Sequence, residues 1–422
     1  MQSKIYPLAI AFYLILINAL SYSSHAQCTS RYLDTIFSTV DTFANIPYTT
    51  TAGGGNNAEL MDIYQPTGDS ACLRHLIIWV HGGAFIQGSK NSDYVELWGK
   101  RYAQRGYVCA SIDYRLAPSI VAMYDSSQIF KYAWYAVSDL KAAIRYFYKD
   151  AIQGNYWNID TNSIFIGGSS AGAIAVDFAS TIDSLGQLAP PFQTVVNNNG
   201  GLEGNSGNDG YSTKVIGVAS LAGAVNNLDW IQHNTPPMIL SQGTADNVVP
   251  YDCDMAFRLY TQGLYPTIHF CGSQEMAPRL DSMGVIYSLQ SFPGSGHVPW
   301  DTNTVIMDRM DSAVTAFFYS VKCSQTTGLC TSPVKPTSVP NISAPAISIY
   351  PNPANDRIYI HVQDQNELLS TTITDYTGRI IKQQNITGTT TSIPVQGLCA
   401  GIYTVRLSLK SNDIIIRKIT IE

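Results

Sequence analysis

The stretch Gly168-Ser169-Ser170-Ala171-Gly172 decides the fold, because a strand-like run precedes it and a helix-competent run follows it. Residues 163–166 (SIFI) favour a buried strand, and residues 173–179 (AIAVDFA) favour a helix. A Gly-x-Ser-x-Gly pattern in this setting predicts a tight turn, with small residues two positions before and after an exposed serine. Ser169 is an alternative nucleophile, but only Ser170 has a glycine at both required positions.

Apolar strands and helices alternate around this turn, which predicts an α/β fold with a mostly parallel sheet covered by helices. Reactive loops of such sheets lie beyond the carboxyl ends of the strands. Helices are expected at 94–105 and at 136–148, where Val137, Leu140, Ile144 and Phe147 share one face. Further strands are expected at 59–64, 76–80, 107–112, 215–219, 238–241 and 286–291.

Two strand-end loops supply partners for Ser170, in the chain order serine, acid, histidine. Asp246 follows the strand at 238–241, and His297 lies on a glycine-rich loop after the strand at 286–291. His297 would take the serine proton, and Asp246 would orient the imidazole. Asp252 and Asp254 are rival acids, but they follow Pro250, where a helix is expected, and they suit its first turn.

The loop His81-Gly82-Gly83-Ala84-Phe85 follows the strand at 76–80 and suits an oxyanion hole. Glycines let backbone N–H groups converge on a developing negative charge. We expect the donors to be Gly83, Ala84 and Ala171, with Gly82 as a further candidate and His81 in a structural role.

The ends of the chain predict export. An apolar run from Ile5 to Leu20 follows Lys4 and precedes Ser24-His25-Ala26, a small-x-small cleavage signal. The run is too short and too interrupted for a membrane anchor, so residues 1–26 are interpreted as a signal peptide and the mature chain as free of transmembrane spans. Residues 324–346, rich in Thr, Ser and Pro, suggest a linker between a domain at 27–323 and a small all-β sandwich at 347–422.

All eight cysteines lie after the cleavage point, so disulfides are expected after export. Spacing suggests the pairs Cys323–Cys330 and, more weakly, Cys253–Cys271, while Cys109 suits a core thiol. The net charge of −6, without a Lys/Arg block, argues against nucleic acid. No metal-site spacing occurs, and the chemistry needs neither metal nor cofactor.

The larger part of the chain resembles one known family, and its tail resembles another. Residues from about 55 to 320 resemble the carboxylesterase and feruloyl-esterase branch of the α/β-hydrolases, through HGGAF (81–85), DYRLAP (113–118), GSSAG (168–172), GTAD (243–246) and GH (296–297). Asp113-Tyr114-Arg115-Leu116 is structural in such relatives. This chain departs from them at Ser169, where an acidic or other residue is usual, and at Ala173, where many have glycine.

The tail resembles the type A C-terminal sorting domain of the type IX secretion system, through IYPNPAND (349–356), TDYTGR (374–379), GIYTV (401–405) and a final strand that contains Lys418. That resemblance implies passage through the periplasm to the outside or the outer surface, with the type IX machinery as partner. A carbohydrate-binding or adhesive sandwich is the alternative.

These features lead us to expect a secreted serine esterase that acts through an acyl-enzyme on medium or polymer-linked esters. A prolyl-oligopeptidase-like peptidase and a non-catalytic surface protein are the alternatives. The insertion at 184–212 is too polar for a lipase lid. Five aromatic residues either line the cleft or pack against the sheet: Tyr124, Phe130, Tyr132, Trp134 and Tyr135.

Overall fold

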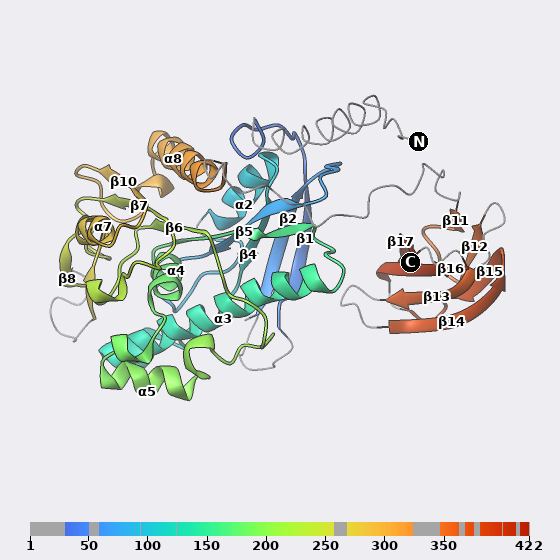
Figure 1. Cartoon of the computed structure of the whole chain (residues 1–422), viewed down its shortest axis with the longest axis horizontal. Helices are drawn as coiled ribbons and strands as arrows, with labels where there is room; N and C mark the ends of the chain where they lie inside the picture. Colours follow the sequence, from blue (N-terminus) through green and yellow to red (C-terminus); the bar gives the residue numbers. More distant parts are fainter. Residues whose placement is uncertain are drawn as a thin grey trace, which may run out of the picture. The chain divides into compact units, whose positions relative to one another are not determined.

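The chain divides into two compact units, Met1–Cys330 and Thr331–Glu422, and the division falls within the segment interpreted as a linker (Figure 1). The signal peptide, the linker and Tyr124 lie outside the residues that the computed structural model describes. The described residues are 30–49, 59–92, 94–123, 125–256, 268–323, 347–362, 368–374, 380–398, 400–410 and 414–421.

An eight-stranded sheet forms the centre of the first unit. The order is β1 (Val40–Pro47), β2 (Leu60–Pro66), β4 (Val108–Ile112), β3 (Arg74–Val80), β5 (Ile159–Ser169), β6 (Gly217–Leu221), β7 (Met238–Gly243), β10 (Tyr287–Phe292). In this order, neighbouring strands from β4 onward pair in parallel, whereas β2 pairs antiparallel with both β4 and β1. Strands β3, β4, β6 and β7 are buried along their whole length, as expected of a sheet covered on both faces.

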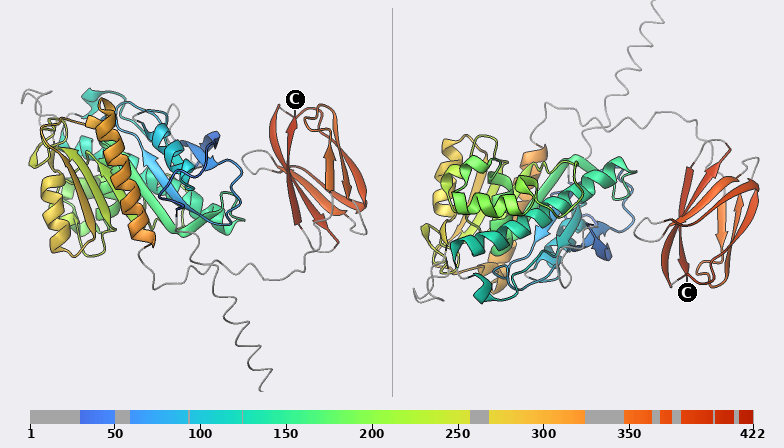
Figure 2. Two further views of the ribbon diagram at one scale, coloured as in Figure 1. Left: turned by 90° about the horizontal axis from the view of Figure 1, so that it is seen from above. Right: turned by 90° about the horizontal axis from the view of Figure 1, so that it is seen from below.

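Helices cover both faces of this sheet, which confirms the predicted fold class. The helices α2 (Val95–Gln104) and α8 (Thr304–Cys323) pack their apolar sides into one core. The other core is formed with α3 (Ser126–Ile152), α4 (Ala171–Thr181), α5 (Pro190–Asn198) and α7 (Ser273–Ser282) (Figures 1 and 2). None of the described helices combines the length and apolar character that a membrane crossing requires.

The helix predicted at 136–148 is longer in the structure and takes up the aromatic residues ahead of it. Asp125 caps its start by accepting a hydrogen bond from the N–H of Gln128 at 2.9 Å. Phe130 and Trp134 are fully buried on α3, and Phe130 stacks on Phe192 of α5. These two aromatic residues therefore belong to the core and do not form a cleft wall.

The described residues directly after Pro250 include a short strand, so the prediction that a helix begins there is wrong. β8 (Cys253–Met255) pairs with β9 (His269–Cys271), and a disulfide joins Cys253 to the directly opposite Cys271. This confirms the weaker of the two predicted pairs. The cross-link holds the segment in a ladder, which overrides its local helix signal.

Cys323 is also disulfide-bonded, and its predicted partner Cys330 lies outside the described residues. Cys109 and Cys72 carry free thiols. Cys109 is fully buried on β4, and burial raises the pKa of its thiol well above the usual value. Cys72, in contrast, is exposed.

The second unit consists of two antiparallel sheets with one apolar core, as predicted for a small β-sandwich. Its alternating strands bury one side each, for example Ile358 and Ile360 on β12. The first sheet contains β11 (Ile347–Tyr350), β12 (Arg357–Val362) and β15 (Thr390–Pro394), and the second β14 (Ile380–Gly388), β13 (Leu368–Thr374), β16 (Gly401–Leu409) and β17 (Ile414–Ile421).

Candidate active site

Ser170 lies at the turn between β5 and α4, with φ 55° and ψ −119°. Such a conformation is strained for a residue with a side chain. The flanking glycines explain how the turn closes. A Cβ on Gly168 would lie 2.3 Å from the carbonyl carbon of Gly172, and one on Gly172 would lie 2.1 Å from the oxygen of Val80. Only glycine fits at these two positions, because the turn brings backbone atoms too close for a side chain. The same tight turn requires the two glycines and forces the strained conformation of Ser170.

His297 reaches Ser170 from the loop that follows β10. Its Nε2 lies 2.8 Å from Ser170 Oγ. The loop is tied to the neighbouring acid loop, because Ala245 N–H donates to Ser295 O at 2.9 Å and Gly294 N–H donates to Thr244 Oγ1 at 2.9 Å. The two loops therefore hold the imidazole jointly.

Asp246 contacts the other side of the imidazole. Its Oδ2 accepts from His297 Nδ1 at 2.7 Å, and its Oδ1 accepts from the N–H groups of Val248 at 2.9 Å and Val249 at 3.1 Å. The carboxylate side chain is 0 % exposed, whereas the imidazole is 17 % exposed. Because a carboxylate only accepts, Nδ1 carries the proton and Nε2 is free to accept from Ser170.

The rival acids lie elsewhere on the same segment. Asp254 is part of β8, and the backbone oxygen of Asp252 accepts from Gly272 N–H at 2.7 Å. Within the described ranges, the hydrogen bonds of His297 go to Ser170 and Asp246.

The loop after β3 turns sharply beside the serine. Gly83 and Ala84 have φ of 102° and 54°, and Gly83 O accepts from the N–H groups of Ile86 and Gln87 at 3.0 and 3.1 Å. Ala171 is the first residue of α4. In the described part of the chain, no acceptor meets the N–H groups of Gly83, Ala84 and Ala171. These three donors remain available to a ligand atom.

His81 is enclosed beneath this loop. Its Nδ1 donates to Gly82 O at 2.7 Å, and its ring stacks on Tyr114 with centroids 4.2 Å apart. Burial lowers the pKa of His81 to about 4, although the bond to Gly82 acts in the opposite direction. The imidazole is therefore neutral near pH 7 and serves to brace the loop, as does the Tyr114 hydroxyl, which donates to His81 O at 3.0 Å.

Asp139 supports the same region and was missed by the sequence reasoning. It is fully buried on α3 and accepts from the backbone N–H of Arg115 at 2.7 Å and from its Nε at 2.9 Å. Ser206 Oγ also donates to it, at 2.6 Å. No motif in the sequence marks Asp139, which lies off the face that Val137, Leu140, Ile144 and Phe147 share on the predicted helix.

A serine at a strained strand-to-helix turn of a mostly parallel sheet, with a histidine and an acid on later strand-end loops, defines an α/β-hydrolase. Residues 61–200 match the profile of the BD-FAE family, and residues 348–422 match that of the secretion system C-terminal sorting domain. The chain thus contains a region similar to the BD-FAE family and, at its end, a region similar to a sorting domain, which indicates a secreted or outer-surface protein.

Two curated relatives are esterases. The gut esterase 1 of Caenorhabditis elegans is 30% identical over 103 residues, and that of Caenorhabditis briggsae is 34% identical over 101 residues. Each match covers 24% of this chain and spans only 17% of the relative.

Among solved structures, a truncated carbohydrate esterase from gut microbiota is 20% identical, with a TM-score of 0.45 over 68% of this chain and 98% of that one. An esterase from Thermogutta terrifontis with bound propionate is 18% identical, with a TM-score of 0.45 over 67% of this chain and 94% of that one.

Proposed function

We propose that the protein is a secreted serine carboxylic ester hydrolase that acts through an acyl-enzyme on medium or polymer-linked esters. One observation carries the proposal: the continuous hydrogen-bond chain from Ser170 Oγ through His297 to Asp246, with distances of 2.8 and 2.7 Å. A hydroxyl that donates to a neutral, carboxylate-oriented imidazole is an activated nucleophile.

In the first half-reaction, Ser170 Oγ attacks the ester carbonyl while His297 Nε2 takes the hydroxyl proton. The imidazolium that forms is stabilised by the buried carboxylate of Asp246. The carbonyl oxygen, now negative, accepts hydrogen bonds from the N–H groups of Gly83, Ala84 and Ala171. His297 then gives its proton to the departing alcohol, and the acyl group stays on Ser170.

In the second half-reaction, a water molecule takes the place of the alcohol. His297 removes a proton from it as it attacks the acyl carbonyl, and the same three N–H groups hold the oxyanion. Collapse of this intermediate returns the proton to Ser170 and releases the acid. Each protein group therefore acts twice, and no other reactant is required.

The polar segment at 184–212 supports an open cleft for medium or polymer-linked esters. Its helix α5 turns Phe192 and Val196 into the core, where Phe192 stacks on Phe130. The exposed side chains of this helix include Thr194 and Asn197. A lipase lid would instead present an apolar face to the substrate.

The test compares labelling and hydrolysis. We expect a fluorophosphonate to modify the wild-type chain but not Ser170→Ala, and p-nitrophenyl acetate to be hydrolysed much faster than amide substrates. Faster amide cleavage would favour the peptidase alternative, and a folded wild-type chain without labelling would favour a non-catalytic surface protein. The type IX secretion machinery is the proposed partner of the tail, and trapping of a tail-less chain in the periplasm of the native host tests that role.

A further inference from the structure

Asp177 is a buried carboxyl group for which the proposed reaction has no use. It lies about two turns along α4 from Ser170 and is fully buried. Ser220 Oγ, on β6, donates to its Oδ2 at 2.8 Å, and the backbone N–H of Ala224 donates to the same carboxyl group. Its Oδ1 has no hydrogen-bond partner among the described residues. Burying a half-satisfied carboxyl group is costly, so its contacts require an explanation.

The segment that Asp177 contacts is the corner at residues 221–225, where the chain leaves β6. Leu221 O accepts from the backbone N–H of Ser170 at 2.8 Å, so the corner holds the nucleophile turn directly. Ala222, with φ 59°, donates from its N–H to Ser241 O at 2.7 Å. Ser241 lies on β7, the strand that leads into the loop of Asp246.

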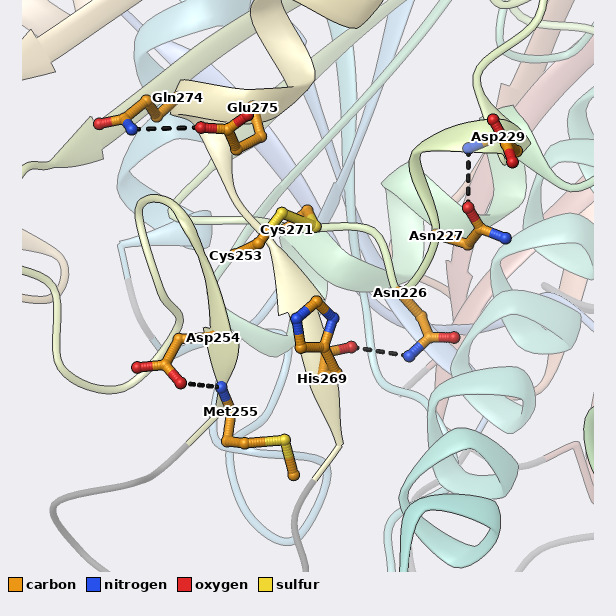
Figure 3. Close-up of a disulfide and its surroundings, with 10 residues drawn as sticks. All are labelled: Asn226, Asn227, Asp229, Cys253, Asp254, Met255, His269, Cys271, Gln274 and Glu275. Atoms are coloured by element: carbon orange, nitrogen blue, oxygen red, sulfur yellow. Dashed lines mark hydrogen bonds between the residues drawn. A yellow bond between two sulfur atoms is a disulfide. The ribbon is translucent and has the colours of Figure 1, made fainter.

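The other end of the corner contacts the hairpin of β8 and β9, which the Cys253–Cys271 disulfide cross-links. Val225 and Cys271 exchange two backbone hydrogen bonds, at 3.1 and 2.8 Å. The side chain of the next residue, Asn226, donates to His269 O at 2.7 Å (Figure 3). The corner at 221–225 therefore touches the nucleophile turn, the strand that carries the acid loop, and the cross-linked hairpin.

The corner and the carboxyl group are packed without spare room. A Cβ on Gly223 would lie 2.2 Å from Ser220 Oγ and 2.3 Å from Asp177 Oδ2. The backbone of Gly223 thus rests directly on the Asp177–Ser220 pair. Burial raises the pKa of Asp177 well above its usual value, while the bonds from Ser220 and Ala224 act in the opposite direction.

We propose that Asp177 is a positioning residue, whose hydrogen bonds to Ser220 and Ala224 set the corner at 221–225 and thereby align the Ser170 turn with the Asp246 loop. This inference rests on the proposed esterase function. Misplacing reacting groups by about 1 Å can cost about 10²-fold in rate. Loss of the carboxyl group is therefore expected to lower kcat and to leave substrate binding unchanged.

The test uses two substitutions that keep the branched shape of the side chain. Asp177→Leu removes both hydrogen bonds, and we expect kcat on p-nitrophenyl acetate to fall about 10- to 100-fold, with KM changed less than about twofold. The rate of fluorophosphonate labelling should fall in parallel. Asp177→Asn keeps an oxygen for Ser220 and Ala224 and should restore at least about half of the wild-type kcat.

Asp311→Asn is the matched control, because Asp311 is a buried acid on α8 that binds Arg105 at 2.6 Å on the other face of the sheet. It should lower stability and leave kcat and KM unchanged. If Asp177→Leu does not fold, Ser220→Ala decides, with an expected fall in kcat of about two- to fivefold at constant KM.

A folded Asp177→Leu chain with wild-type kcat, or an Asp177→Asn chain as inactive as Asp177→Leu, would overturn the positioning role while leaving the esterase function in place. The same holds if Ser220→Ala, used as the deciding variant, keeps full kcat. A wild-type chain that neither hydrolyses esters nor reacts with a fluorophosphonate would overturn the esterase function, and the positioning role with it.

Discussion

Replacing Asp246 by asparagine tests the hydrogen-bond chain that joins Asp246 to Ser170 through His297. The substitution changes one terminal group of a side chain that is 0 % exposed and bonded on both sides. Oδ1 accepts from the N–H groups of Val248 and Val249, and these donors require an oxygen opposite them. The amide of asparagine must therefore place its NH₂ group toward His297 Nδ1.

That orientation forces the imidazole into the wrong tautomer. An NH₂ group donates, so Nδ1 must accept, and the ring proton moves to Nε2, which faces Ser170 Oγ at 2.8 Å. A protonated Nε2 cannot take the serine proton. We expect kcat to fall by about 10⁴-fold, which corresponds to about 5.4 kcal/mol of barrier at about 1.36 kcal/mol per factor of ten.

The assay is steady-state hydrolysis of p-nitrophenyl acetate, with circular dichroism to confirm folding. The melting temperature should change little, because the backbone donors keep their acceptor. Asp252→Asn and Asp254→Asn make the same chemical change on the same segment and should retain wild-type kcat. An active Asp246→Asn chain, together with collapse in either control, would show that the acid has been assigned to the wrong residue.

Three further predictions concern stability and domain structure. Replacing Cys253 and Cys271 together by serine removes a cross-link between positions 18 residues apart, and should lower the free energy of unfolding by about 3 kcal/mol in urea titrations; an unchanged midpoint would mean that the hairpin needs no cross-link. Because burial raises the pKa of Asp177, the native state keeps a proton that the unfolded chain releases above pH ~4, so stability falls as pH rises from there toward the folded pKa. As pH rises, the stability of Asp177→Asn relative to wild type should therefore grow by up to about 1.36 kcal/mol per pH unit. Thermal melts of the two chains from pH ~5 to ~9 test this, and a difference between the two chains that stays constant with pH would contradict it. A chain that ends at Cys330, the boundary of the first unit, should fold and keep its kcat on soluble esters, whereas a folded but inactive product would argue against two separable units.

Much of the nucleophile turn could be predicted from sequence because its determinants are local. The steric contacts at Gly168 and Gly172 demand glycine, so a short pattern between a strand and a helix already carries the geometry. The positions of Asp246 and His297 after apolar strands were equally informative, because parallel strands end on one side of a sheet. The structure brings these two residues together with Ser170 through hydrogen bonds.

The features that the sequence could not predict depend on contacts between distant segments. Pro250 and the acids after it suggest a helix start, but the disulfide to Cys271 places that segment in a ladder. Asp177 looks like an ordinary polar residue within a short helix. Its burial becomes visible only when the corner at 221–225 is seen to pack on it.

Among the described residues, the free thiols of Cys72 and Cys109 can report how often the folded protein opens. Cys72 is exposed and would react quickly with a maleimide. Cys109 is fully buried on β4, which lies between β2 and β3 in the sheet. Its sulfur can meet a reagent only while the sheet is open, so its labelling rate measures how often that happens. At low reagent concentration the rate follows the population of open molecules, and at high concentration it approaches the opening rate itself. Mass spectrometry of the Cys109 peptide would therefore time the unfolding of each variant discussed above in native buffer, without heat or denaturant.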